Sequence, residues 1–573
     1  MKLLFLTTIL SFFVPSFFLS ACPADGKMKK PVIVEEKNST TEEKTKDNKP
    51  APEQKPDPFA VENSSHILVL GGGYSPSGNQ VSLESNVKYF RKIRASIGLT
   101  AASMHTYFAD GKDQGRDLQF FDPNFSVPDI NLVFAELFGK TKGIANQYRS
   151  NQLNPNGSST IANLDRWFNQ RKKSQIAGIN LIYFTGHGGK GGSKTPHNTT
   201  VYLWSNVRLK VDEFVKKLDQ LPIEQSTILV MVQCYSGGFA NVLFENGDPK
   251  KGLSKHARAG FFSTIQTRVA AGCTPDIREE NYQEYSTSFW EALSGVSRIG
   301  KKISKPDYNS DGQTSLMEAH SYVSINSNTI DIPIKTSDVL LRKFLPDEFK
   351  PKVKTPEKTE VLDKYLPDFL KKDLNSTETQ PVVKLDDFSK TNLSDWAKPE
   401  ENAILVNLSK TLELKEDYPG KEIKKLQEQL KKERESIEKE KKKASDQKNK
   451  YRDELRKLLM SKHPEISNPY HPTTTLLLST DQKQGVLKIV NQEGTWGKLL
   501  KEKEKVEKLE SQRFIIEKKE VKIMRLRRCI ENIILAHLLT QKGSSDQIMQ
   551  YNRLLTLERF ILSNKSNAKH LTP

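Results

Sequence analysis

The chain has 573 residues, of which 28% are charged and 36% belong to the hydrophobic set. This length predicts roughly three or four structural units, and the low hydrophobic share indicates that some segments are solvated tether or exposed helix. The four cysteines, Cys22, Cys234, Cys273 and Cys529, form no Cys-x-x-Cys pair, which excludes a ribbon-type zinc site, a thioredoxin-like motif and a disulfide scaffold.

The beginning of the chain is typical of an export signal. Lys2 precedes an apolar run that ends in Leu19-Ser20-Ala21-Cys22. Small residues before a cysteine resemble the lipobox of bacterial lipoproteins, in which the cysteine becomes the lipidated N-terminus. An ordinary signal peptide with an incidental cysteine is the alternative. We expect residues 1–22 to be a lipoprotein signal peptide, Cys22 to be lipidated, and the protein to be anchored in the cell envelope, at the outer membrane, in the periplasm or at the cell surface.

The segment that follows lacks the apolar residues needed for a core. Residues 23–60 are rich in Lys, Glu, Thr, Asn and Pro, so they cannot bury enough apolar surface to fold. We expect a disordered tether between the lipid and a folded domain. Because no later segment offers about 18 consecutive apolar residues, no second membrane span is expected.

Short apolar runs alternate with helical patterns between residues 61 and 340. The expected strands are 66–70, 180–184, 227–233 and 267–271, and the expected helices are 83–96, 161–174, 211–220 and 285–294. Short runs that are apolar on both faces suit strands covered on both sides. The alternation therefore predicts an α/β sandwich with a mainly parallel sheet, and sites in such sheets form beyond the carboxyl ends of strands.

Two residues at such strand ends have the chemistry of a thiol nucleophile and its base. His187 lies between Gly186 and Gly188, and Cys234 precedes the turn Tyr-Ser-Gly-Gly. Glycines allow a tight turn and a close approach of substrate to the backbone. A cysteine nucleophile needs a thiolate, a nearby imidazole and donors for the oxyanion. A buried structural cysteine beside an ordinary loop histidine is the alternative.

The segments Thr-Gly-His187-Gly and Gln-Cys234-Tyr-Ser-Gly-Gly resemble the signature of the clan CD cysteine peptidases, which include caspases and legumains. The spacing of 47 residues agrees with the caspase spacing of about 50. The resemblance implies a caspase-like three-layer sandwich over residues 61–340, with Cys234 as nucleophile and His187 as general acid and base. It also implies an oxyanion hole made by the N–H groups of Gly188 and Cys234, and it requires no cofactor for catalysis.

Two further features lie near this resemblance. Cys273 is a rival thiol, and we interpret it as a pocket wall or packing residue because no histidine in a glycine turn precedes it at a matching distance. The loop with Asp276, Glu279 and Glu280 would favour a basic residue before the scissile bond, although exposed loops are often acidic for solubility alone.

Residues 307–318 fill the template of an EF-hand calcium loop, with Gly312 at the sixth position. The expected oxygen ligands are Asp307, Asn309, Asp311, the Gln313 carbonyl, Ser315 and Glu318. The preceding segment contains glycine and proline and is a poor helix, so we expect a lone structural calcium loop. A turn rich in Asp and Asn that leads into a helix is the alternative.

The rest of the chain predicts a linker and a basic helical tail. Residues 341–410 are rich in Lys, Pro, Thr and Asp, which is typical of a linker with short helices. Residues 411–573 carry 36 basic and 24 acidic residues, and apolar residues recur in 421–460 and 497–541 with a rough seven-residue period, as in a coiled coil. We expect an antiparallel helical hairpin that offers a surface to a protein partner and not to nucleic acid, since interleaved Glu favours a solvated face.

Together these features predict an exported, lipid-anchored cysteine endopeptidase that acts on a protein or peptide substrate. Two alternatives remain. The same dyad could perform transamidation, as some legumain relatives do, or the domain could be an inactive scaffold that presents its helical tail to a partner. An activated Cys234 distinguishes the enzymes from the scaffold.

Overall fold

The computed structural model describes residues 65–174, 177–346, 383, 388, 391–414, 420–479, 482–492 and 494–562. The predicted signal peptide, the tether and Cys22 lie outside these residues. Within them, no helix combines the length and the apolar composition that a membrane crossing requires.

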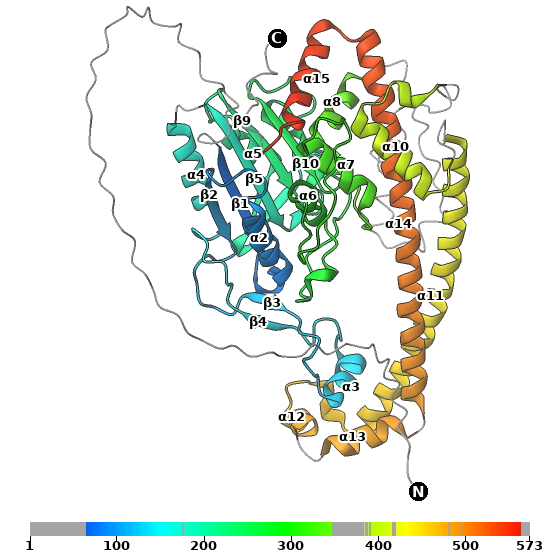
Figure 1. Ribbon diagram of the computed structural model, residues 1–573. Coiled ribbons are helices and arrows are strands. Elements are labelled where there is room, and N and C mark those ends of the chain that lie inside the picture. The colour runs from blue at the N-terminus through cyan, green and yellow to red at the C-terminus, as the bar shows by residue number, and fades with distance from the viewer. Residues whose placement is uncertain are drawn as a thin grey trace, which may run out of the picture. The chain divides into compact units, whose positions relative to one another are not determined.

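The core of the fold is a six-stranded sheet with the strand order β11-β10-β9-β5-β1-β2 (Figure 1). Its strands are β1 (His66–Gly72), β2 (Ser103–Phe108), β5 (Gly178–Gly186), β9 (Gln225–Met231), β10 (Arg258–Phe262) and β11 (Ile334–Lys335). All neighbouring pairs are parallel except β10 with the short edge strand β11. Every residue of β5 and β9 is buried, as expected of strands covered on both faces. The prediction of a mainly parallel sheet is confirmed.

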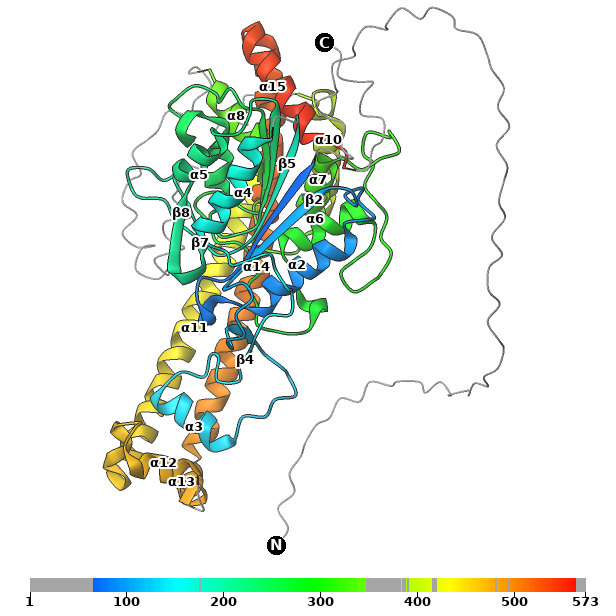
Figure 2. The same ribbon diagram turned by 90° about the vertical axis from the view of Figure 1, so that its left-hand side faces the viewer.

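Helices cover both faces of this sheet, which makes three layers (Figure 2). One face carries α2 (Val81–Ile93), α6 (Tyr285–Ser294) and α7 (Leu316–Asn326), and the other carries α4 (Ile161–Lys173) and α5 (Val211–Leu218). The side chains of β1 alternate between the two cores. Ile67 and Val69 pack in the first core, whereas Leu68 and Leu70 pack in the second, as the two-residue period of a strand requires.

Two small sheets and a further helix also belong to the α/β part, within the residues that the structure describes. The strands β3 (Leu118–Phe120) and β4 (Gln147–Arg149) form one antiparallel pair, and β6 (Gly188–Gly189), β7 (Thr200–Leu203) and β8 (Val207–Lys210) form a three-stranded sheet. Helix α3 (Asp129–Phe138) lies between β3 and β4 in sequence.

The four expected helices of the α/β part are present, but one expected strand is wrong. Residues 267–271 form no strand, and the strand beside β9 is instead β10, Arg258–Phe262. The apolar-run criterion missed β10 because it begins with a charged residue. The Arg258 guanidinium is buried and pairs with Asp219 at 2.5 Å. This ion pair offsets the cost of burying a charge in the sheet.

The C-terminal region is helical, as predicted. It comprises α10 (Pro399–Thr411), α11 (Gly420–Lys462), α12 (Pro472–Ser479), α13 (Gln482–Asn491), α14 (Thr495–Lys542) and α15 (Ser545–Glu558), whereas α8 (Thr336–Phe344) directly follows β11 and belongs to the α/β part. Helices α11 and α14 lie side by side in both views (Figures 1 and 2). Ion pairs join Arg434 to Glu520 and Lys441 to Glu510. A later residue of α11 thus meets an earlier residue of α14, which makes the hairpin antiparallel.

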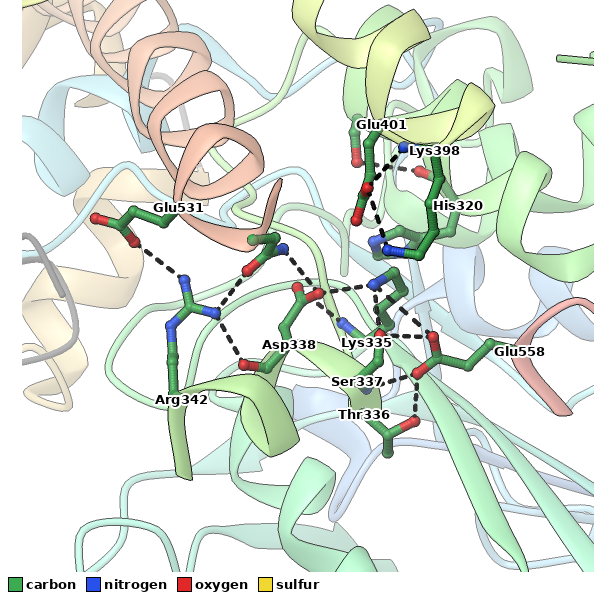
Figure 3. Close-up of polar contacts among 12 residues, drawn as sticks. His320, Lys335, Thr336, Ser337, Asp338, Arg342, Lys398, Glu401, Glu531 and Glu558 are labelled. Carbon is green, nitrogen blue, oxygen red and sulfur yellow. Dashed lines mark hydrogen bonds and ion pairs between the residues drawn. The ribbon is translucent and has the colours of Figure 1, made fainter. Parts of the chain in front are cut away.

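Buried ionic contacts connect this helical region to the α/β part (Figure 3). The Glu558 carboxylate of α15 accepts hydrogen bonds from Thr336 Oγ1 and from both the N–H and the Oγ of Ser337, at 2.6–2.7 Å. It therefore caps the N-terminus of α8. Lys335 Nζ donates to Asp338 at 2.8 Å in the same cluster. Removing one partner of such a buried group typically costs about 3–5 kcal/mol, so these contacts attach the helical region firmly.

Apolar contacts lead to the same conclusion. Phe560 and Leu562, beyond the last helix, belong to the core beneath α2, α6 and α7, and the Phe560 carbonyl accepts a hydrogen bond from Leu316 N–H at 3.1 Å. At the other end of the hairpin, Ile130 and Leu137 of α3 pack with side chains of α11, α13 and α14. The helical region is therefore part of the same folded unit.

Candidate active site

His187 and Cys234 occupy equivalent positions beyond two neighbouring parallel strands. Phe184 of β5 is in register with Met231 of β9, and each candidate residue follows three positions later. The Val232 N–H extends the ladder by donating to the Phe184 carbonyl at 3.2 Å. The two strand ends thus carry the imidazole and the thiol to the same edge of the sheet.

The backbone around these two residues is packed so closely that glycine is required. A Cβ atom on Gly188 would lie 2.2 Å from the Cys234 carbonyl oxygen and 2.6 Å from Gln233 Cγ. One on Gly186 would lie 2.8 Å from the carbonyl oxygen of Gly72. The glycines that flank His187 therefore allow the ends of β5, β9 and β1 to converge. This contact also brings the two predicted oxyanion donors, Gly188 and Cys234, next to each other.

The His187 ring is oriented by the loop that follows β1. Its Nε2 lies 2.7 Å from the Gly78 carbonyl oxygen and 3.0 Å from Gln80 Oε1. Both are acceptors, so a neutral imidazole carries its proton on Nε2 and its lone pair on Nδ1. Tyr74 packs edge-on against the ring, with the centroids 5.2 Å apart. Nδ1 is thus the nitrogen that is available to accept a proton.

This loop was missed as a functional element by sequence reasoning. Gly71-Gly72-Gly73 lacks the spacing of a dinucleotide motif, and the structure gives the run a different role. A Cβ on Gly73 would lie 2.2 Å from the Gly78 carbonyl oxygen, and the Gly73 N–H donates to Asn79 Oδ1 at 3.0 Å. Asn79 Nδ2 in turn donates to buried Asp117 at 2.9 Å. The glycine run lets the loop fold back, so that Gly78 and Gln80 reach His187.

Cys234 lies against the loop that follows β10. The Ala270 N–H donates to Cys234 Sγ at 3.4 Å, and the Tyr235 N–H donates to the Arg268 carbonyl oxygen at 2.7 Å. Tyr235 has a φ of 61°, a left-handed conformation that is uncommon for a bulky residue. Such strain persists only where surrounding contacts impose it, and it is concentrated at functional turns.

Burial sets the charge state of the pair at rest. It raises the pKa of the Cys234 thiol above its ordinary value of 9.0, and the Ala270 N–H only partly opposes this effect. Burial also lowers the pKa of His187 below its ordinary value of 6.5, against the hydrogen bond to Gly78. Both shifts favour the neutral forms. At neutral pH the pair is therefore a thiol and an uncharged imidazole.

The rival thiol, Cys273, lies close to the same strand ends. Its Sγ is 3.9 Å from the Gly186 carbonyl oxygen, and its φ is 55°. It does not follow a strand, contrary to the expectation from residues 267–271. Burial raises the pKa of its thiol well above the ordinary range, and the neighbouring Cys234 adds to this effect. Its surroundings favour the thiol form, as those of Cys234 do, so what distinguishes Cys273 is its position and not its charge state.

A cavity of about 220 Å³ opens beside Cys273. Gly272, Thr274 and Glu284 line it, together with Phe514 and Lys518 of α14. Burial raises the pKa of Glu284 to about 7, although Arg298 opposes this shift. The cavity is thus bounded by a buried carboxyl group and by the helical region.

The acidic loop expected near the specificity pocket is partly neutralised. The Asp276 carboxylate accepts from Arg278 at 2.7–3.1 Å and from Asn281 at 2.9 Å. Of the two other residues, Glu279 and Glu280, neither lines the cavity.

The side chains of the predicted calcium loop accept hydrogen bonds from the loop's own backbone. Asp307 accepts from the N–H groups of Asp311 and Gly312 at 3.0 Å, and Asp311 accepts from Gln313 N–H at 2.8 Å. Glu318 is buried, and its oxygens accept from Tyr308, Asn309 and Ser315. With Ser315 it forms a capping box at the start of α7.

These hydrogen bonds occupy carboxylate oxygens that the predicted calcium site would use. Within the described residues, no group of three or more His, Cys, Asp and Glu side chains could hold a metal ion. Calcium binding by this loop therefore stays a prediction.

Comparison with solved structures finds a distant likeness. The crystal structure of caspase-1 from Spodoptera frugiperda matches 50% of this chain and 92% of its own chain, at 9% sequence identity and a TM-score of 0.28. No protein-family model matches the chain, and no curated protein matches it. A likeness at this identity and TM-score establishes neither the activity nor the catalytic residues of this chain.

Proposed function

We propose that the chain is a cysteine endopeptidase in which Cys234 is the nucleophile and His187 the general acid and base. The observation that carries the proposal is the equivalent placement of the two residues beyond paired strands, with Gly188 in contact with the Cys234 backbone. The contacts of His187 Nε2 with Gly78 and Gln80 support it further, because they leave Nδ1 as the basic nitrogen of the neutral ring.

The resting charge state determines how the reaction begins. The thiol proton of Cys234 passes to Nδ1 of His187 as Sγ attacks the carbonyl carbon of the scissile bond and forms a C–S bond. The resulting oxyanion accepts hydrogen bonds from the N–H groups of Gly188 and Cys234. When the tetrahedral intermediate collapses, the C–N bond breaks, and the imidazolium gives its proton to the leaving amine.

The thioester is then hydrolysed. His187 takes a proton from a water molecule as the oxygen of that water attacks the thioester carbon, and the C–S bond breaks. The proton returns to Sγ, the acid product leaves, and the resting thiol is restored. An amine in place of water would give transamidation by the same steps, so the product identifies the acceptor.

The experiment is a cleavage screen with a peptide library, using the wild type, Cys234→Ala, His187→Ala and the matched control Cys273→Ala. Cys234→Ala should abolish cleavage. His187→Ala should lower kcat/KM by at least about 10²–10⁴-fold, since general acid–base help alone is worth that much. Cys273→Ala should keep most of the activity. Full activity in Cys234→Ala would refute the proposal, and new amide bonds in place of free acids would identify a transamidase.

We further propose that the enzyme is anchored in the cell envelope through a lipid on Cys22. The support is the sequence alone, an apolar run that ends in Leu19-Ser20-Ala21-Cys22. Metabolic labelling with a lipid precursor should mark the wild type and not Cys22→Ser. A mature N-terminus elsewhere, with a free amine, would contradict the anchor.

A further inference from the structure

Helix α14 reaches the loop that contacts the candidate nucleophile. Glu517 of α14 accepts a hydrogen bond from Arg268 Nη2 at 3.1 Å, and both side chains are largely buried. Arg268 precedes Ala270 by two residues, and its carbonyl accepts the Tyr235 N–H at 2.7 Å. One ion pair therefore connects the helical region with the turn that follows Cys234.

A second contact route starts from Arg525, about two helical turns after Glu517 in α14. This guanidinium is buried and donates to the carbonyl oxygens of Ser324, Ser327, Thr329 and Asp331, at 2.7–3.3 Å. Four backbone acceptors from one short segment are thus satisfied by a single side chain. The segment that follows α7 is fixed by a residue almost 200 positions later.

This segment in turn holds the loop beside the thiol. Asp331 Oδ1 accepts the Ala271 N–H at 2.7 Å, and the preceding N–H, that of Ala270, donates to Cys234 Sγ. The two routes converge on residues 268–271. Because those residues form no strand, these contacts replace the ladder that would otherwise hold them.

The charges along the second route depend on each other. Burial raises the pKa of Asp331 to about 6, against the Ala271 N–H and the charge of Arg525. The charge of Arg268 also opposes the rise in the pKa of Asp331. Without Arg525, the buried carboxylate would lose its main counter-charge and would protonate more readily, which weakens its hold on the Ala271 N–H.

We propose that Glu517 and Arg525 are positioning residues for Cys234, so that the C-terminal helical region is part of the catalytic machinery. The inference rests on the proposed function for its meaning, because a positioned thiol matters only to an enzyme that uses it. α14 acts through the loop 268–271 and does not touch the thiol itself. Through that loop, α14 fixes the position of the nucleophile from outside the α/β part.

The test compares Glu517→Gln with Glu136→Gln in the full chain. Both substitutions are isosteric, and both remove a carboxylate from an ion pair between α14 and the α/β part. Glu136 of α3 pairs with Lys503 at 2.8 Å near the end of the hairpin, where no residue of the loop 268–271 takes part. The readout is the rate at which iodoacetamide alkylates Cys234, mapped by mass spectrometry across pH.

We expect Glu517→Gln to change the alkylation rate of Cys234 and its pH profile, and to lower kcat/KM about tenfold through kcat. Glu136→Gln should leave both unchanged. Arg525→Lys, which keeps the charge beside Asp331 but fewer donors, should fall between the wild type and Arg525→Met. If the Arg525 variants fail to fold, the Glu517 comparison decides alone.

Equal alkylation profiles in Glu517→Gln and Glu136→Gln would overturn the inference. This outcome is distinct from failure of the proposed function, which would appear in the wild type as absence of any Cys234-dependent cleavage. Alkylation needs no turnover, so the positioning of the thiol is measured even then.

Discussion

Replacing Gly188 by alanine tests the close approach on which the candidate site depends. The added Cβ would lie 2.2 Å from the Cys234 carbonyl oxygen. Cβ atoms in proteins essentially never come within 3.0 Å of a heavy atom outside their own and the adjacent residues. The two backbones must therefore separate by about 0.8 Å or more. Neither backbone is the flexible end of a side chain, so the strain cannot be relieved cheaply.

A displacement of this size falls on the proposed nucleophile, its proposed base and both proposed oxyanion donors together. Misplacement by about 1 Å can cost roughly 10²-fold in rate, and we expect at least that loss in kcat/KM for Gly188→Ala. The matched control is Gly192→Ala in the same loop, where the nearest atom to an added Cβ is Thr195 Oγ1 at 3.6 Å. The assay is peptide cleavage, with melting curves to verify folding. Full activity in Gly188→Ala would refute the reasoning.

Three further predictions follow from charge and burial. The pKa of His187 is lowered from 6.5 and that of Cys234 is raised from 9.0, so both groups are neutral between these values. We therefore expect kcat/KM to show a plateau there, and to fall below pH 6.5 and above pH 9. A maximum of kcat/KM confined to acid pH would contradict the neutral pair. The pKa of Glu284 is raised from 4.5 to about 7, so between these values the folded state binds more protons than the unfolded state. The free energy of unfolding should therefore fall as pH rises through this window, by up to about 3 kcal/mol. Glu284→Gln should remove this part of the pH dependence, and chemical denaturation that gives the variant the same pH dependence as the wild type would contradict the prediction. Glu318→Ala should lower the melting midpoint even in the presence of a chelator, because it leaves the N–H groups of Tyr308 and Ser315 without their acceptor. If the loop also binds calcium, as its sequence predicts, millimolar calcium should raise the melting midpoint of the wild type and not that of Glu318→Ala.

Local patterns were enough to predict the parallel sheet and the placement of His187 and Cys234 beyond two of its strands. Both residues follow strands that are apolar on both faces, and the glycines beside them indicate turns. Such signals lie within a few residues of the element they describe, so they are readable in one sequence. The same criterion failed at β10, because the strand begins with Arg258, whose buried guanidinium has partners in Asp219 and the Val242 carbonyl oxygen.

The contacts that complete the site could not be predicted, because they join residues that are far apart in the chain. Nothing near His187 indicates that Gly78 and Gln80 will reach its Nε2, more than a hundred positions away. The basic, charged composition of the tail indicated a solvated hairpin. Its few buried charges, Glu517 and Arg525 among them, instead find partners in the α/β part, and a periodic pattern cannot distinguish these residues from exposed neighbours.

The identity of the cysteine that reacts with a peptide-based covalent inhibitor tests the central claim most directly. The protein would be incubated with a thiol-reactive peptide inhibitor at neutral pH, digested, and mapped by mass spectrometry, in the wild type, His187→Ala and heat-unfolded protein. We predict that Cys234 alone is modified in the folded wild type, and that modification slows strongly in His187→Ala and on unfolding. Modification of Cys273 before Cys234, or a Cys234 adduct that forms equally fast in His187→Ala, would contradict the account.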